Sequence, residues 1–75
     1  MNGHGITVGA AFAVNRGTRG NHPGAPGLVR GVVLNVSPTG RTVELSLIDG
    51  TLVLAGPAVL VCTWAEHVAA TGALR

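Results

Sequence analysis

The sequence predicts an all-β fold, a five-stranded small barrel with a short C-terminal helix. Three observations favour this fold class: apolar residues alternate along several short segments, turn sequences separate those segments, and a helix-capping pattern occurs near the C-terminus. A chain of 75 residues has room for one domain, so we expect a single barrel domain over residues 1–75.

The first predicted strand covers residues 6–14. One face of it carries, at every second position, Ile6, Val8, Ala10, Phe12 and Val14. Residues 15–27 then form a long loop rich in glycine and proline. A loop of this length in so small a domain is typical of a functional or a disordered segment.

The second predicted strand covers residues 28–36, with Gly31 placed at a bend or a bulge. The sequence SPTG at residues 37–40 has the residue order of a type I turn. We therefore expect a hairpin that joins the second strand to a third strand.

The strongest pattern is the hairpin of residues 41–54, in which apolar and polar residues alternate up to Asp49-Gly50. This dipeptide is typical of a two-residue type I′ turn. Counting across such a turn pairs Leu45 with Leu54, and it places Ile48 and Val53 on the outward face. The predicted core is Val8, Phe12, Val33, Leu45, Leu47, Leu52, Leu54 and Leu60.

The C-terminal third begins with Gly56-Pro57, which ends the fourth strand. Residues 57–59 suit one tight helical turn, and residues 60–62 suit a short fifth strand. Thr63 stands three residues before Glu66, the spacing of a capping box, and Gly72 suits a helix C-terminus. These signals predict a helix over about residues 64–71.

This element order resembles the SH3-like small barrels, including KOW and Tudor-type modules. The resemblance rests on residues 8–14 and on the segments GVVLNV (31–36), VELSLIDG (43–50) and GPAVLV (56–61). It implies a barrel whose long first loop often bears the binding surface. The chain has no tyrosine and lacks the aromatic cluster with which Tudor and peptide-binding SH3 domains hold ligands, so no ligand is carried over.

The composition indicates a small core and a surface with few charges. Hydrophobic residues make up 47% of the chain and charged residues only 11%, while Phe12 and Trp64 are the only aromatic residues. A single cysteine, Cys62, excludes a disulfide within the chain. We therefore expect apolar surface to be presented to a partner and stability to come partly from association.

We predict a non-enzymatic interaction module that self-associates or sits as a small structural subunit on a larger assembly, such as a virus particle. The candidate partner-binding residues are Arg16, Arg19, Arg30, Ile48 and Val53. The alternative is weak nucleic-acid binding, in which the arginines contact phosphates. Such binding would be weak because the net charge is only +2 and stacking aromatics are lacking.

Other function classes find little support. Three acidic residues leave no evident general acid and base pair, so we expect no enzyme. The loop glycines do not form a phosphate-binding motif, and His4, His22 and His67 lack metal-ligand spacing, so no cofactor or metal is expected. Neither a signal peptide nor a membrane-length apolar run is visible. We expect a cytoplasmic or virion-associated protein with no membrane partner.

Overall fold

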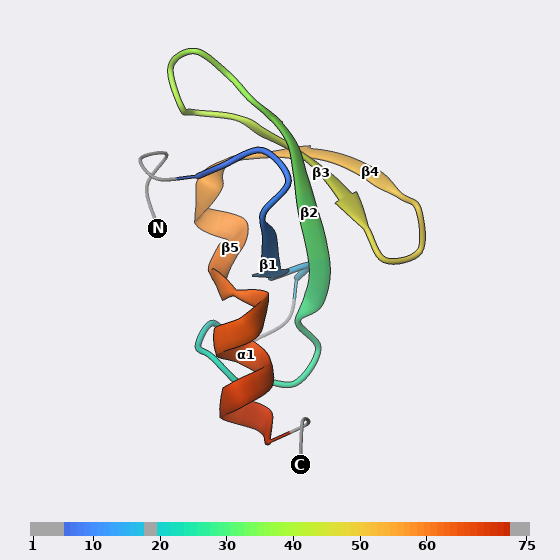
Figure 1. Ribbon diagram of the computed structural model, residues 1–75, viewed down its shortest axis with the longest axis vertical. Coiled ribbons are helices and arrows are strands. Elements are labelled where there is room, and N and C mark those ends of the chain that lie inside the picture. Colours follow the sequence, from blue (N-terminus) through green and yellow to red (C-terminus); the bar gives the residue numbers. More distant parts are fainter. Residues whose placement is uncertain (1–5, 18–19, 73–75) are drawn as a thin grey trace.

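The computed structural model describes residues 6–17 and 20–72 (Figure 1). Five antiparallel strands form one sheet in the order β4-β3-β2-β1-β5. The elements are β1 (Ala11–Val14), β2 (Val29–Val36), β3 (Val43–Leu47), β4 (Leu52–Ala55), the 3-10 turn η1 (Pro57–Val59), β5 (Leu60–Thr63) and α1 (Trp64–Thr71). The predicted all-β class with five strands and a C-terminal helix is confirmed. The sheet is not closed into a barrel, since β4 and β5 remain its two edges.

The first strand is shorter than predicted because a turn precedes it. Gly9 adopts a left-handed conformation with φ of 92°, and the Ala10 N–H donates to the Thr7 carbonyl at 3.0 Å. The alternation that the sequence shows over residues 6–10 therefore does not correspond to a strand. Val8 lies in this turn with 59% of its surface exposed, so its predicted burial is wrong.

Gly31 lies in the regular part of β2, and the irregularity comes later. A Cβ atom at Gly31 would stand 2.8 Å from Val14 Cγ2, so close packing explains this glycine, and the predicted bend or bulge there is wrong. The pairing with β3 shifts between Val33 and Asn35. Leu34 and Asn35 thus oppose the single residue Glu44, which is the arrangement of a β-bulge.

The hairpin between β3 and β4 has a three-residue loop instead of the predicted two-residue loop. The Gly50 N–H donates to the Leu47 carbonyl and the Leu47 N–H donates to the Thr51 carbonyl, both at 2.9 Å. Gly50 has φ of 87°, and the Asp49 side chain accepts the Thr51 N–H at 2.9 Å. These contacts describe a type I turn followed by a left-handed glycine.

The longer loop shifts the register of β4 by one residue. Leu45 pairs with Val53 and Glu44 with Leu54. Because side chains alternate along a strand, a one-residue shift turns every side chain of β4 to the other face. Val53 therefore packs against the core, while Leu52 and Leu54 are 64% and 72% exposed. The predicted burial of these two leucines and the predicted outward orientation of Val53 are both wrong.

The main core lies on the inner face of the sheet. Its buried members are Phe12, Val14, Val33, Val43, Leu45, Leu47 and Leu60, which include five of the residues predicted from the sequence. A second cluster of buried residues lies on the opposite face of β1 and β5 and comprises Ala13, Ala25, Leu28 and Cys62, with Val61 and Trp64 packed against it. The first loop and α1 thus cover one half of the outer face.

The helix α1 spans the predicted residues and is capped at both ends. The Glu66 N–H donates to Thr63 Oγ1 at 3.1 Å, the Thr63 N–H donates to Glu66 Oε1 at 3.0 Å, and Gly72 is left-handed. Buried His67 accepts the Gly24 N–H at Nδ1 at 3.0 Å, which ties the first loop to the helix. Within residues 6–17 and 20–72, no helix is long and apolar enough to span a membrane.

Candidate interaction surface

In the part of the chain that the structure describes, neither α1 nor the first loop covers the other half of the outer face, over β2, β3 and β4. We call it the bare outer face. The side chains on it are Val32, Leu34, Asn35, Glu44, Ser46, Leu52 and Leu54. Leu34 is 41% exposed, so three leucines from two strands are in contact with solvent on the same side of the sheet.

Two local irregularities put these leucines outside. The bulge in β2 keeps Leu34 on the outer side with Asn35, and the three-residue hairpin loop turns Leu52 and Leu54 outward. Burial of a leucine side chain contributes about 1.5–3 kcal/mol. The isolated chain gains little of that stabilisation at Leu52 and Leu54, whereas a partner covering this face would recover it.

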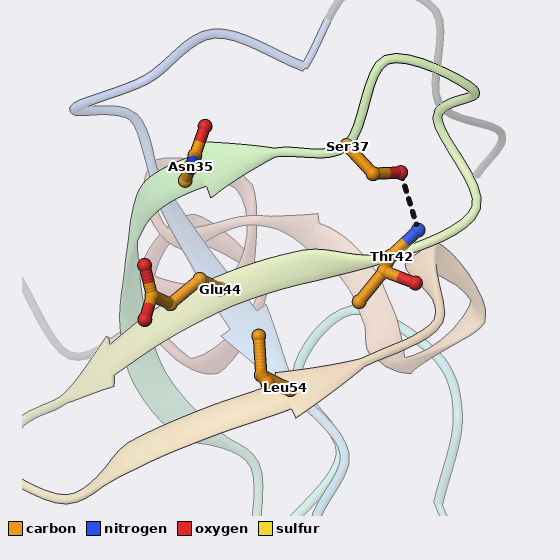
Figure 2. Close-up of a pocket in the computed structure, with 5 residues that line it drawn as sticks. All are labelled: Asn35, Ser37, Thr42, Glu44 and Leu54. Atoms are coloured by element: carbon orange, nitrogen blue, oxygen red, sulfur yellow. Dashed lines mark hydrogen bonds between the residues drawn. The ribbon is translucent and has the colours of Figure 1, made fainter.

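A pocket of about 280 Å³ opens on the bare outer face, and Figure 2 shows its lining. The lining residues come from β2, β3, β4 and the loop between β2 and β3: Asn35, Ser37, Thr42, Glu44 and Leu54. Ser37 Oγ accepts the Thr42 N–H at 3.1 Å, which holds the two sides of the hairpin together. Among the described lining residues, Glu44 is the one titratable group.

The edge strand β4 also presents backbone hydrogen-bonding groups next to the bare outer face. The bond from the Leu47 N–H to the Thr51 carbonyl identifies Leu47 and Thr51 as a hydrogen-bonded pair. Bonded and non-bonded pairs alternate along antiparallel strands, so Val53 and Ala55 also face β3 with their backbone groups. The backbone N–H and C=O groups of Leu52 and Leu54 consequently point away from β3, along the free edge of the sheet.

The structure brings together only some of the predicted partner-binding residues. Arg16 and Ile48 border a second pocket of about 200 Å³ together with Asp49, and the Ile48 N–H donates to the Arg30 carbonyl at 3.1 Å. Val53 is turned to the core. Arg19 lies outside the described residues.

The arginines that the structure describes do not form a single basic patch. Arg16 and Arg30 lie near the hairpin loop at residues 48–50, whereas Arg41 lies at the other end of β3. Arg41 and Ile48 are seven residue steps apart along β3 and its flanking residues, which corresponds to about 23 Å at the rise of a β-strand. Phosphate contacts by all of these arginines would require a ligand that extends over this distance.

Among the residues that the structure describes, three titratable groups have a shifted pKa, and each shift has a local cause. The pKa of Asp49 is lowered by hydrogen bonds from the Thr51 side chain and backbone, and the pKa of Glu66 by those from the Thr63 backbone and side chain. Burial raises the pKa of the Cys62 thiol, so the unreactive protonated form is favoured. In the part of the chain that the structure describes, no three metal-ligating side chains come together.

No protein-family model matches the chain, and comparisons with curated proteins and with solved structures find no match. The function is therefore inferred from the surface itself. In the described residues this surface carries three exposed leucines, Leu34 on β2 and Leu52 and Leu54 on β4, and one pocket lined by a single carboxylate, and β4 is an edge strand of the sheet.

Proposed function

We propose that the protein is a non-enzymatic interaction module that self-associates through the bare outer face. The observation that carries this proposal is the exposure of Leu52 and Leu54 on an edge strand, on the same side of the sheet as Leu34. Leu52 and Leu54 are exposed on a strand whose outward backbone groups have no partner among the described residues, and such an edge strand is typical of a surface at which another chain binds.

The charge distribution supports association. Only 11% of the residues are charged, and the net charge is +2, so copies of the chain repel one another weakly. The bare outer face also carries Glu44 and Ser46 between its apolar strands. An interface that combines apolar side chains with a few polar groups fits a protein partner.

The architecture supports a relationship with the SH3-like modules. β2, β3 and β4 are joined by short hairpins, and η1 stands between β4 and β5, as the resemblance implies; β5 pairs with β1. We infer an open variant of this fold, in which the free edge at β4 is available for contact. The same face would serve if the chain sat on a larger assembly instead of on a second copy.

Thermal unfolding at different protein concentrations tests self-association. Binding that occurs only in the folded state makes Tm rise with concentration, so we expect a higher Tm for the wild type at millimolar than at micromolar concentration. Leu54→Ser should remove this dependence. Val8→Ser is the matched control. Val8 is likewise exposed, at 59%, but it lies in the turn before β1, on the far side of β2 from β4. A wild-type Tm that is independent of concentration would contradict self-association.

A further inference from the structure

We propose that β4 pairs in antiparallel orientation with β4 of a second copy, so that two five-stranded sheets become one continuous sheet. This inference rests on the proposed self-association and specifies its geometry. It predicts that the contact is made by the backbone of the edge strand as well as by leucine side chains.

The backbone of β4 is suited to this pairing. Leu52 and Leu54 direct their N–H and C=O groups away from β3, with Val53 between them. In antiparallel register, Leu52 of one copy faces Leu54 of the second copy, and each such pair exchanges two hydrogen bonds. Val53 then stands opposite Val53 of the second copy, beside a twofold axis. The contact is the same for both copies and closes at a dimer.

The side chains follow from the same register. A twofold axis perpendicular to the sheet keeps the bare outer faces of both copies on one side. Cross-strand neighbours in an antiparallel pair have Cβ atoms about 4.5–5.5 Å apart. Leu52 and Leu54 of both copies would therefore form one apolar cluster across the junction, and the surface that is 64% and 72% exposed in the single chain would be partly buried.

The charges at the two ends of β4 select the antiparallel orientation. Arg41 lies beside Gly56, where a Cβ atom would be 3.8 Å from the Arg41 carbonyl oxygen, and Asp49 lies in the loop before β4. Both side chains are exposed, and hydrogen bonds from Thr51 lower the pKa of Asp49, so its carboxylate is charged at neutral pH.

Antiparallel pairing brings Arg41 of each copy near Asp49 of the other. The two residues are then separated laterally by about two strand spacings, about 10 Å, which an arginine side chain and an aspartate can bridge. Parallel pairing would bring the two Arg41 residues together instead. Arg16 of the same chain also lies near Asp49, so the complementarity is between Arg41 and Asp49 and does not extend to the whole loop. This pair favours a second copy of the chain in the antiparallel orientation, and a second copy is the occupant that we propose.

Hydrogen exchange of individual amides tests the pairing. We expect the amides of Leu52 and Leu54 to exchange more slowly as the protein concentration is raised, while those of Val53 and Ala55, already bonded to β3, change little. A dimer with unchanged exchange at Leu52 and Leu54 would overturn this geometry and leave self-association intact. A monomer at every concentration would overturn both proposals.

Variants at one position separate the backbone contact from the side-chain contact. Leu54→Ala removes most of the side chain but keeps the outward N–H, whereas Leu54→Pro also removes that N–H without interrupting the ladder to β3. We expect Leu54→Pro to weaken dimerisation at least tenfold more than Leu54→Ala, as measured by sedimentation equilibrium of samples that circular dichroism shows to be folded. Equal affinities of the two variants would contradict backbone pairing.

Substitution of Arg41 tests the orientation. Arg41→Glu should weaken dimerisation severalfold at low salt, and the difference from wild type should shrink as salt is added because exposed charges are screened. Arg41→Gln removes the charge without reversing it, so its dimerisation affinity should lie between those of the wild type and Arg41→Glu. An Arg41→Glu variant that dimerises as well as the wild type at low salt would overturn the antiparallel arrangement.

Discussion

The register of β4 predicts opposite effects of alanine substitution at two adjacent residues. Val53 is half-buried and packs against the main core, whereas Leu54 is 72% exposed. Val53→Ala removes two methyl groups, worth about 0.8 kcal/mol each when fully buried, so about 1 kcal/mol of the free energy of unfolding should be lost. Leu54→Ala should change the free energy of unfolding of the single chain by less than about 0.5 kcal/mol.

Urea unfolding followed by the fluorescence of Trp64 measures the free energy of unfolding of each variant, and micromolar concentration keeps the protein monomeric. For a domain of this size, 1 kcal/mol corresponds to a Tm change of about 4–8 °C, so thermal unfolding gives a second readout. The two-residue turn would bury Leu54 and expose Val53. A larger loss of stability for Leu54→Ala than for Val53→Ala would therefore refute the register.

Two further predictions concern the packing of β2 against β1 and the cap of α1. Gly31→Ala should lower the free energy of unfolding by about 1–3 kcal/mol, because the new Cβ would lie 2.8 Å from Val14 Cγ2. Gly56→Ala is the control, because its new Cβ would have its nearest contact at 3.8 Å and Gly56 has a negative φ. Urea unfolding should show almost no change in stability for this variant. The lowered pKa of Glu66 means that its ionised form stabilises the fold above its ordinary pKa of 4.5 and that this stabilisation is lost as pH falls through the lower folded-state value. Stability measured from pH 6 to pH 2 should thus fall on the acid side, and Glu66→Gln should reduce the fall; an unchanged profile would contradict the capping contribution.

Local sequence signals were sufficient for the elements that local chemistry determines. The capping box at Thr63 and Glu66 predicts α1, and the sequence of residues 37–40 predicts the hairpin between β2 and β3; the structure contains both. Gly56-Pro57 likewise marks the end of β4. These features depend on residues a few positions apart, whose contacts do not require knowledge of the rest of the fold.

The register of β4 could not be read from the sequence because Asp49-Gly50 fits two turns. The dipeptide occupies the centre of a two-residue type I′ loop, and it equally fits the end of a three-residue loop in which Gly50 is left-handed. The two turns give registers of β4 that differ by one residue. The two-residue turn would bury Leu52 and Leu54, so their hydrophobicity favours it, but the structure has the register of the three-residue loop. Hydrophobicity is thus a poor guide to the register of an edge strand with apolar residues on both faces.

Contacts between residues that are distant in the sequence also could not be predicted from local sequence patterns. The bulge at Leu34 and Asn35 is defined by pairing with Glu44, and the role of Gly31 depends on its packing against Val14. Whether the sheet closes depends on the relative positions of both edge strands, which no local pattern contains. The two-residue turn places Ile48 and Val53 on one outward face, whereas in the three-residue loop that the structure has, Ile48 is exposed and Val53 packs against the core.

The most direct test of the central claim is the molar mass of the wild-type chain, measured by light scattering coupled to size exclusion from micromolar to millimolar concentration. The exposed leucines on the edge strand predict a mass that rises from 7.5 kDa toward twice that value, and a Leu54→Ser variant that stays near 7.5 kDa throughout. A wild-type mass that remains at 7.5 kDa over the whole range would contradict self-association through the bare outer face.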